Sequence, residues 1–347
     1  MTDKLKIAII ADPFLPVPPS GYGGIERIIS FLIKHLVDNG HEVILVAHQD
    51  SVVPITLIPF GNQNNALKHV NNLLIVNKIK KFRPDIIHSF GRLAYLLPFL
   101  RSQTPKIMSY QRKPTISQIR KAILIGKKGS LSFTGCSHYI SNQIKPYADV
   151  TTIYNGFPVG IYEPNFNYNP EAPLIFLGRI EYIKGTHIAI EIAKKTNSNL
   201  IIAGNVPEFK NQYFEEQIEP FLSEKIKYLG VVNDLRKNEL LQQAKALLMP
   251  VLWDEPFGIV MVEAMACGTP VIGLDRGGLS EIIKQGYSGF VCNTIPEMIN
   301  CVRKINNLSR KCVWKYAMQN FSSIQITNTY EQLYLRKIRS QNNDLLS

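Results

Sequence analysis

The stretch Met249–Ile272 reads MPVLWDEPFGIVMVEAMACGTPVI, and it decides the fold class. It begins within one apolar run, Ala246–Pro250, and ends in another, Pro270–Ile272. Short uncharged runs of this kind are typical of fully buried strands in parallel sheets. Between them Phe257–Ala266 has the composition of a helix, which Gly268 ends. Strand, helix and strand in this order predict an α/β protein with a parallel sheet.

Further apolar runs, separated by segments of helix length, predict two sheets of this kind. In the first half the runs are Ile7–Ile10, Val43–Ala47, Ile86–His88, Lys106–Ser109 and Phe133–Cys136. In the second half they are Leu174–Leu177, Leu200–Ala203, Ile226–Leu229, Ala246–Pro250 and Pro270–Ile272. We therefore expect two doubly wound, Rossmann-like domains that face each other across a cleft, with ligands bound beyond the carboxyl ends of the strands.

The segment Thr152–Pro173 is rich in Asn and Pro, which is typical of a linker. It places the first domain at residues 1–160 and the second at residues 161–320. Residues 321–347 have the pattern of a polar helix with basic ends, and we expect this tail to pack back on the first domain.

Composition narrows the class of protein and its surroundings. The 347 residues are 45% hydrophobic and 19% charged, which excludes a disordered or collagen-like chain. Five cysteines without metal or disulfide spacing favour a reducing cytoplasm. The first apolar run, Ile7–Ile10, is too short for a signal peptide, and no uncharged apolar stretch approaches the ~20 residues that span a bilayer.

The net charge of +12 predicts an anionic partner, and it is unevenly distributed. Up to Asn165 the chain has 19 Lys and Arg against 9 Asp and Glu, a balance of +10, and the remainder contributes +2. A dense part is Arg112–Lys128, where isoleucines at helical spacing lie beside Lys and Arg. This pattern suits an anionic membrane surface, although a solvated face over an ordinary core has the same pattern.

Two carboxylates in the opening stretch are candidates for sugar binding. Glu255 precedes the predicted helix and Glu263 lies inside it. Carboxylates accept hydrogen bonds, so the pair suits sugar hydroxyls, while the backbone N–H groups of Phe257, Gly258 and Ile259 at the helix start suit sugar oxygens. The alternative for Glu263 is a buried acid paired within the core.

Two other loops have the chemistry of anion sites. After the first apolar run, Gly23 and Gly24 precede a helical segment, and glycines there let backbone N–H groups approach an anion. After Leu174–Leu177, the cations Arg179 and Lys184 suit a diphosphate. The alternatives are a plain turn at the glycines and solvated cations that pair with Glu181. As a dinucleotide fingerprint the glycine loop is poor, because Glu26 occupies the third glycine position.

Together these motifs resemble the retaining glycosyltransferases of family 4, which have the GT-B fold. The resemblance covers nearly the whole chain and is carried by Gly23-Gly24-x-Glu26, Asp85–Ser89, Asn155-Gly156, Gly178-Arg179-x4-Lys184-Gly185 and Glu255–Ile272. It implies that residues 1–160 bind the acceptor and residues 161–320 a nucleoside-diphosphate sugar.

The resemblance also implies a role for each candidate residue. Glu263 would hold the ribose of the sugar donor. Glu255 and the backbone of Phe257, Gly258 and Ile259 would hold the hexose. The diphosphate would be neutralised by Arg179 and Lys184 and approached by Gly23 and Gly24.

A histidine of the first domain lies near the donor sugar in this family, often within a His-x-His pair, which makes His88 the candidate catalytic residue beside Glu255. Here the pair reads His88-Ser89-Phe90. If the second histidine is the functional one, Phe90 has replaced it, and His88 is a core or loop residue.

We therefore predict a retaining transferase of hexoses or related sugars that needs neither metal nor other cofactor, because the chain has no Asp-x-Asp motif. Its acceptor is expected to be a lipid-linked or envelope glycan, and its location cytoplasmic, with peripheral contact at the inner face of the membrane. The alternatives are a nucleotide-sugar epimerase of the same fold and a nonenzymatic basic module that binds membrane or nucleic acid. Nucleic acid is not expected as a partner of the transferase.

Overall fold

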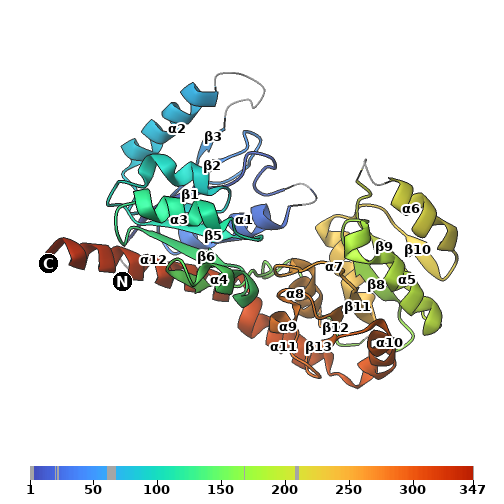
Figure 1. Cartoon of the computed structure of the whole chain (residues 1–347). Coiled ribbons are helices and arrows are strands. Elements are labelled where there is room, and N and C mark those ends of the chain that lie inside the picture. The colour runs from blue at the N-terminus through green and yellow to red at the C-terminus, as the bar shows by residue number, and fades with distance from the viewer. Residues whose placement is uncertain are drawn as a thin grey trace. The chain divides into compact units, whose positions relative to one another are not determined.

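The computed structural model describes residues 4–19, 21, 23–60, 68–167, 169–207 and 211–346. It divides into two units (Figure 1). The first contains Met1–Asn155 together with Ser323–Ser347, and the second is Gly156–Ser322. The division after Asn155 falls within the linker segment, and the C-terminal helix belongs to the first unit.

In the described part of the first unit, seven parallel strands form a sheet with the order β3-β2-β1-β4-β5-β6-β7. The strands are β1 (Lys6–Ile10), β2 (Glu42–Ala47), β3 (Thr56–Pro59), β4 (Ile86–Ser89), β5 (Lys106–Tyr110), β6 (Leu131–Gly135) and β7 (Val150–Thr152). The helices are α1 (Gly24–Asp38), α2 (Lys68–Phe82), α3 (Ile116–Ile125), α4 (His138–Ile144), α12 (Ser323–Leu346) and the 3-10 helix η1 (Leu93–Phe99).

In the described part of the second unit, six parallel strands have the order β10-β9-β8-β11-β12-β13. They are β8 (Leu174–Leu177), β9 (Leu200–Ala203), β10 (Ile226–Tyr228), β11 (Ala246–Met249), β12 (Val271–Leu274) and β13 (Gly289–Cys292). The helices are α5 (Thr186–Lys195), α6 (Asn211–Gln217), α7 (Asp234–Gln243), α8 (Ile259–Ala266), α9 (Leu279–Ile282), α10 (Ile295–Lys304) and α11 (Arg310–Phe321). Short 3-10 turns cover Tyr182–Lys184, Glu219–Phe221 and Ile305–Asn307.

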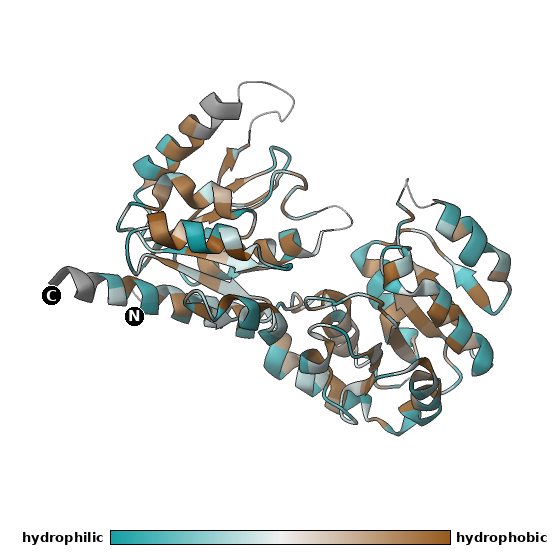
Figure 2. Ribbon diagram, viewed as in Figure 1, coloured by the Kyte–Doolittle hydropathy of each residue, from teal (hydrophilic) through white to brown (hydrophobic). Residues whose placement is uncertain are grey.

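The central strands of both sheets are buried on both faces, as their unbroken apolar runs predict. Every residue of β4, β5, β8, β11 and β12 is buried. Figure 2 shows β8 and β11, which are labelled in Figure 1, as mainly hydrophobic segments, with hydrophilic residues more frequent on the helices. The predicted class, two doubly wound Rossmann-like domains, is confirmed.

In each sheet the strand order reverses at one place, between β1 and β4 in the first unit and between β8 and β11 in the second. Loops leaving the carboxyl ends of such strands diverge, and ligands of doubly wound sheets bind there. The fold therefore directs attention to the loops after β4 and β5 and to those after β8, β11 and β12.

The C-terminal helix α12 contributes to the core of the first unit. It packs against α1, and its Tyr330 and Tyr334 are almost completely buried. Glu331 on the same helix accepts a hydrogen bond from Asn39 at 2.9 Å and pairs with the buried His41 at 3.1 Å. No helix in the described part of the chain has the length and apolar character needed to cross a membrane.

Candidate functional site

Three loops of the second unit meet at the carboxyl edge of its sheet. The backbone N–H of Leu252, after β11, donates to the carbonyl of Ile183, after β8, at 2.8 Å. The N–H of Gly278, after β12, donates to the carbonyl of Glu255 at 2.8 Å. The loops after β8, β11 and β12 are thus held together by main-chain hydrogen bonds.

Two glycines allow this close approach. Gly185 has φ 76°, and a Cβ there would lie 2.0 Å from the carbonyl oxygen of Pro250. Gly277 has φ 65°, and a Cβ there would lie 2.3 Å from the carbonyl oxygen of Glu255. Any other residue would clash and would be strained at these φ angles, so glycine is required at both positions.

Glu255 and Lys184 lie in contact across two of these loops. The Nζ of Lys184 donates to Oε2 of Glu255 at 2.6 Å, and the indole N–H of Trp253 donates to the same oxygen at 3.0 Å. The ammonium also lies 4.6 Å from the centroid of the Trp253 ring. The structure therefore brings together two of the residues predicted to contact the donor, one for the hexose and one for the diphosphate.

Arg179 lies in the same loop as Lys184 and is paired with Glu181 at 3.1 Å. Glu181 is buried, whereas the Arg179 side chain is partly exposed. The pairing with Glu181 that the sequence allowed is therefore present. Both predicted diphosphate cations have a carboxylate partner, and a bound anion would join or compete with that partner.

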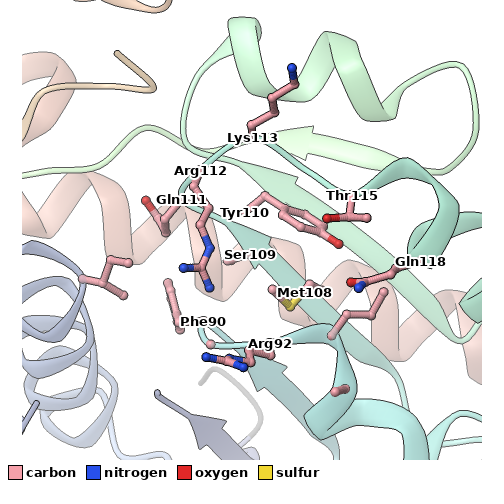
Figure 3. A pocket seen from close by; sticks show the side chains of 14 residues that line it. Phe90, Arg92, Met108, Ser109, Tyr110, Gln111, Arg112, Lys113, Thr115 and Gln118 are labelled. Atoms are coloured by element: carbon pink, nitrogen blue, oxygen red, sulfur yellow. The ribbon is translucent and has the colours of Figure 1, made fainter. Parts of the chain in front are cut away.

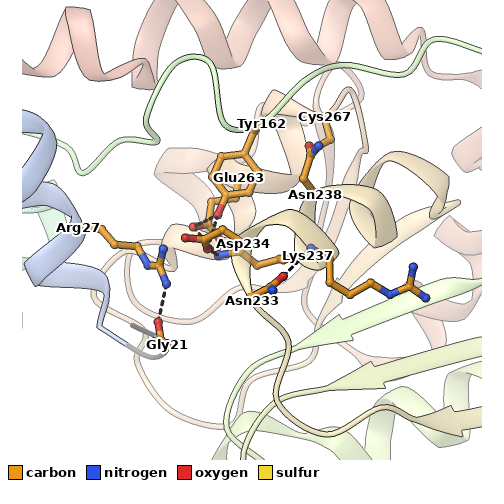
Figure 4. Close-up of polar contacts among 10 residues, drawn as sticks. Gly21, Arg27, Tyr162, Asn233, Asp234, Lys237, Asn238, Glu263 and Cys267 are labelled. Carbon is orange, nitrogen blue, oxygen red and sulfur yellow. Dashed lines mark hydrogen bonds and ion pairs between the residues drawn. The ribbon is translucent and has the colours of Figure 1, made fainter. Parts of the chain in front are cut away.

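Glu263 is more deeply buried than Glu255, with 3% exposure against 8%. Its Oε1 accepts hydrogen bonds from the hydroxyl of Tyr162 and the Nζ of Lys237, both at 2.8 Å, and its Oε2 accepts from the same ammonium at 2.8 Å. Lys237 also pairs with Asp234 at 3.3 Å. Figure 4 shows Tyr162, Asp234 and Lys237 gathered around the carboxylate.

The helix that carries Glu263 begins later than predicted. The composition predicted a helix over Phe257–Ala266, but α8 begins at Ile259. The reason is Gly258, whose φ of 80° is left-handed and ends the preceding loop rather than continuing a helix. The backbone of Phe257, Gly258 and Ile259 therefore forms the turn into α8, at the positive end of its dipole.

Arg310 connects the two helices of this site, α7 and α8. The buried guanidinium donates to the carbonyls of Ala244 at 2.8 Å and Gln242 at 3.1 Å, which end α7, and it also bonds Thr269, which follows α8. A cation at the carboxyl ends of helices is favoured by their dipoles. Arg310 thus helps to fix Lys237 on α7 against Glu263 on α8.

Sequence reasoning missed Tyr162, Lys237 and Arg310. Tyr162 and Lys237 contact Glu263 from 101 and 26 positions away in the sequence. Arg310, the first residue of α11, bonds a residue that follows the helix of Glu263. Nothing in the local pattern at Lys237 distinguishes it from other lysines on polar helices. The available signal was the cost of burying Glu263 without a partner, which required a cation or hydroxyl somewhere in the fold.

The glycine loop of the first unit leads directly into α1. Gly24 is the first residue of the helix rather than a residue before it, and Gly23 precedes it with φ 151°. A Cβ on Gly23 would lie 2.6 Å from the side chain of Pro19. Glu26 in the first turn is buried, and burial raises the pKa of its carboxyl.

The surroundings of His88 are those of a core residue, which is the alternative that the sequence left open. The side chain has no exposed surface, its Nδ1 lies 2.6 Å from the hydroxyl of Tyr334, and its Nε2 lies 2.6 Å from Oγ of Ser109. Burial lowers the pKa of the imidazole to about 3. A neutral, enclosed ring favours the core alternative for His88, and the neighbouring Phe90 lines a pocket.

The basic stretch Arg112–Lys128 contains the loop after β5 and helix α3. Ile119 is fully buried against the unit's core, whereas Leu124 is 87% exposed and Ile123 and Ile125 are also exposed. Lys127 and Lys128 follow immediately and are exposed. One face of α3 is therefore ordinary core, and its C-terminal end presents apolar and basic side chains to solvent.

Comparison with known proteins identifies the family. Residues 22–159 match the family model described as Glycosyltransferase Family 4, and residues 163–311 match the model described as Glycosyl transferases group 1. The glycogen synthase of Mycobacterium tuberculosis is 30% identical over 335 residues, which cover 79% of this chain and 80% of that protein.

Solved structures show the same fold. A glycosyltransferase from Rickettsia africae has a TM-score of 0.79 at 21% identity and covers 97% of this chain and 99% of its own. The Anabaena protein Alr3699/HepE, solved in complex with UDP and glucose, has a TM-score of 0.73 at 18% identity and covers 95% and 99%. The fold is thus the GT-B fold of glycosyltransferases. The chain belongs to glycosyltransferase family 4.

Proposed function

We propose that the chain transfers a hexose or related sugar from a nucleoside-diphosphate sugar to an acceptor hydroxyl, with retention of the anomeric configuration. The observation that carries this proposal is the group of side chains at the carboxyl edge of the second sheet. Lys184 and Glu255 are in contact across the loops after β8 and β11. Glu263 lies on the helix that follows the second of these loops.

The proposed sugar-donor site uses each of these residues for one part of the substrate. Carboxylates accept from sugar hydroxyls, so Glu263 suits the ribose and Glu255 the hexose. Arg179 and Lys184 suit the diphosphate, as fixed cations that stabilise the charge of the leaving group. The complex of the Anabaena protein with UDP and glucose supports UDP-glucose as the first donor to test.

We propose that the fixed cations make a metal unnecessary. The departing diphosphate gains negative charge as its bond to the sugar breaks, and Arg179 and Lys184 already lie in the loop that we assign to it. Activity in the presence of EDTA would support this part of the proposal, and full recovery only after addition of Mg²⁺ or Mn²⁺ would overturn it.

We propose further that the C-terminal end of α3 touches an anionic membrane surface. Ile123, Leu124 and Ile125 are exposed and are followed by Lys127 and Lys128. Apolar side chains enter the interface of a bilayer, and each nearby cation contributes about 1 kcal/mol on an anionic surface. This surface would bring the enzyme to a lipid-linked or envelope acceptor on the cytoplasmic face.

The test is a panel of sugar nucleotides, beginning with UDP-glucose, incubated with the full chain and candidate acceptors. Transfer with the donor's anomeric configuration, read from the proton coupling of the product by NMR, supports the proposal. An inverted product would overturn retention. Conversion of the sugar nucleotide in the absence of acceptor would instead establish an epimerase. Binding to vesicles or nucleic acid that is unaffected by sugar nucleotides, without any turnover, would favour a nonenzymatic module.

A further inference from the structure

The first unit contains a pocket that the proposed sugar-donor site does not use. It has a volume of about 410 Å³ and lies where the loops after β4 and β5 leave the sheet, next to the start of α1 (Figure 3). It therefore lies at the switch point of the first sheet, where doubly wound domains bind ligands. Its apolar wall includes Phe90 and Met108, and its polar groups come from Arg92, Tyr110, Gln111 and Arg112.

The hydroxyl of Tyr110 is the first sign that this pocket is built for a polar ligand. Tyr110 is 7% exposed, and within the described part of the chain its hydroxyl has no hydrogen-bond partner. Burial raises the pKa of this phenol to about 12, so it remains a hydrogen-bond donor at neutral pH. Leaving such a group buried and unpaired is energetically unfavourable. A ligand that accepted a hydrogen bond from this hydroxyl would remove that cost.

Charge is the second sign. The guanidinium groups of Arg92 and Arg112 both lie 3.7 Å from the carboxylate of Asp12, and Lys113 also lines the pocket. The two arginine side chains are 53% and 65% exposed. A single carboxylate shared by two guanidiniums leaves positive charge and N–H groups for an anion. Figure 3 shows the Arg92 and Arg112 side chains on one side of the pocket and the Tyr110 hydroxyl on the other, near Gln118.

The remaining polar groups of the pocket further restrict the chemical class of ligand that fits it. Ser109 lines the pocket, but its hydroxyl already bonds Nε2 of His88 at 2.6 Å and the hydroxyl of Thr134. The carbonyl of the Gln111 side chain accepts from Asn155 at 2.7 Å, so its amide nitrogen is a further hydrogen-bond donor at the pocket. The available groups are thus mainly hydrogen-bond donors and cations, which suits a carboxylate or phosphate.

We propose that this pocket is the acceptor subsite and that it selects an acceptor carrying a carboxylate or phosphate, held by Arg92 and Arg112 with Tyr110 as a neutral hydrogen-bond donor. The inference rests on the proposed transferase function. In the transfer, the acceptor hydroxyl oxygen forms a bond to the anomeric carbon and the bond from that carbon to the β-phosphate oxygen breaks. The hydroxyl proton leaves with the nucleoside diphosphate. The anion itself is not consumed and serves to position the hydroxyl.

The experiment titrates inorganic phosphate into the full chain by calorimetry, in the presence of saturating UDP so that the sugar-donor site is occupied. Wild type and the matched control Arg101→Gln, an exposed arginine outside the pocket, are expected to bind phosphate equally. Arg92→Gln and Arg112→Gln should each weaken it at least tenfold. Equal affinity in these variants, or no phosphate binding by wild type, would overturn the proposal.

Tyr110→Phe supplies a second readout that does not depend on the arginines. Because the hydroxyl has no partner within the described residues, its removal should leave the Tm unchanged or raise it, while the phosphate affinity falls several-fold. A lower Tm with unchanged phosphate affinity would show that the hydroxyl serves the protein's own core. If UDP itself fails to bind, the proposed function fails separately, and the dependence of phosphate binding on Arg92 and Arg112 still tests the pocket.

Vesicles distinguish the two sources of the anion. If the phosphate belongs to a lipid, Arg112→Gln should reduce binding to phosphatidylglycerol vesicles as well as to inorganic phosphate. If the acceptor is a soluble acid or sugar phosphate, Arg112→Gln should leave vesicle binding unchanged but should abolish the binding of soluble phosphate. Either result supports an anion subsite, and loss of vesicle binding with soluble phosphate affinity intact would overturn it.

Discussion

The Nζ of Lys237 lies 2.8 Å from both carboxylate oxygens of Glu263. This pair joins α7 to α8 in the second unit, and Tyr162 donates a third hydrogen bond to the same carboxylate. The carboxylate is therefore fixed in one orientation. A ribose hydroxyl bound by Glu263 must share these oxygens with the ammonium, and the following substitutions separate the structural role of the pair from binding.

Glu263→Gln should weaken the binding of UDP and of UDP-glucose by the same factor, about tenfold or more, because both ligands contain the ribose. The substitution also removes the buried counter-charge of Lys237 and leaves this ammonium paired with the more exposed Asp234. The free energy of unfolding should therefore fall by less than the roughly 3–5 kcal/mol that is typical when one partner of a fully buried ion pair is removed. Lys237→Met is the matched control, since it breaks the same ion pair and leaves the Glu263 carboxylate in place. It should lower the Tm similarly but retain most of the UDP affinity by calorimetry. Unchanged affinity in Glu263→Gln would remove Glu263 from the sugar-donor site.

Arg179→Gln should weaken the binding of UDP and of UDP-glucose to the same extent, because the guanidinium is assigned to the diphosphate. The binding of uridine, which has no diphosphate, should be unaffected. A loss of about tenfold is expected for one charge-assisted contact. Arg236→Gln is a suitable control, since Arg236 is an arginine of the same unit, half exposed and paired with Glu239 on the surface of α7. A loss confined to UDP-glucose would contradict the diphosphate assignment.

Glu255→Gln should separate the hexose from the nucleotide. The carboxylate and a diphosphate compete for the ammonium of Lys184, which lies 2.6 Å from Oε2 of Glu255. Removing the negative charge should therefore leave UDP affinity unchanged or raise it, while UDP-glucose binding and turnover fall. Calorimetry with both ligands measures this difference. A parallel loss of both ligands would show that Glu255 supports the loop rather than the hexose.

The sequence predicted the fold class because the central strands are buried on both faces and form uninterrupted apolar runs. It missed β3, β7 and β13, which lie at or near the edges of their sheets. β3 includes Pro59, and β7 is only half-buried, so neither has the apolar pattern of a central strand. Short edge strands are defined by the neighbour with which they pair more than by their own composition.

The candidate site was predictable to the extent that its residues lie in local motifs. Lys184 and Glu255 were found because each follows a recognisable strand. The partners of Glu263 were not, since Tyr162 and Lys237 are distant in sequence and carry no local signal. The burial of His88 depends on Tyr334, which is 246 residues away on α12, so no pattern around His88 distinguished a catalytic ring from a core one.

The exposed end of α3 predicts binding to anionic vesicles. Leu124→Glu replaces an 87% exposed apolar side chain with an acid, so it should not disturb the core. It should greatly reduce cosedimentation with phosphatidylglycerol vesicles and leave UDP affinity unchanged. Val231→Glu is a matched control, an exposed apolar residue on the second unit. Equal vesicle binding by wild type and Leu124→Glu would show that this end of α3 is only a solvated surface.

His88 predicts how stability changes with pH. The pKa of the folded imidazole is about 3, against 6.5 for an unperturbed histidine. Below pH 6.5 the unfolded chain takes up a proton at this position that the folded chain does not, so the free energy of unfolding should fall between pH 6.5 and 3. One proton corresponds to about 1.4 kcal/mol per pH unit well below 6.5.

His88→Gln removes this titration while keeping a polar side chain beside Ser109 and Tyr334. Its unfolding free energy, measured with urea from pH 7 to 4, should therefore decline less steeply than that of wild type by about that amount per pH unit. At pH 7 the variant should be less stable because the hydrogen bonds to Ser109 and Tyr334 are imperfect, yet its UDP affinity should equal that of wild type. Parallel pH curves for wild type and variant would show that His88 is protonated in the folded protein. Loss of turnover in a sample of the variant that is fully folded would restore His88 as a catalytic candidate.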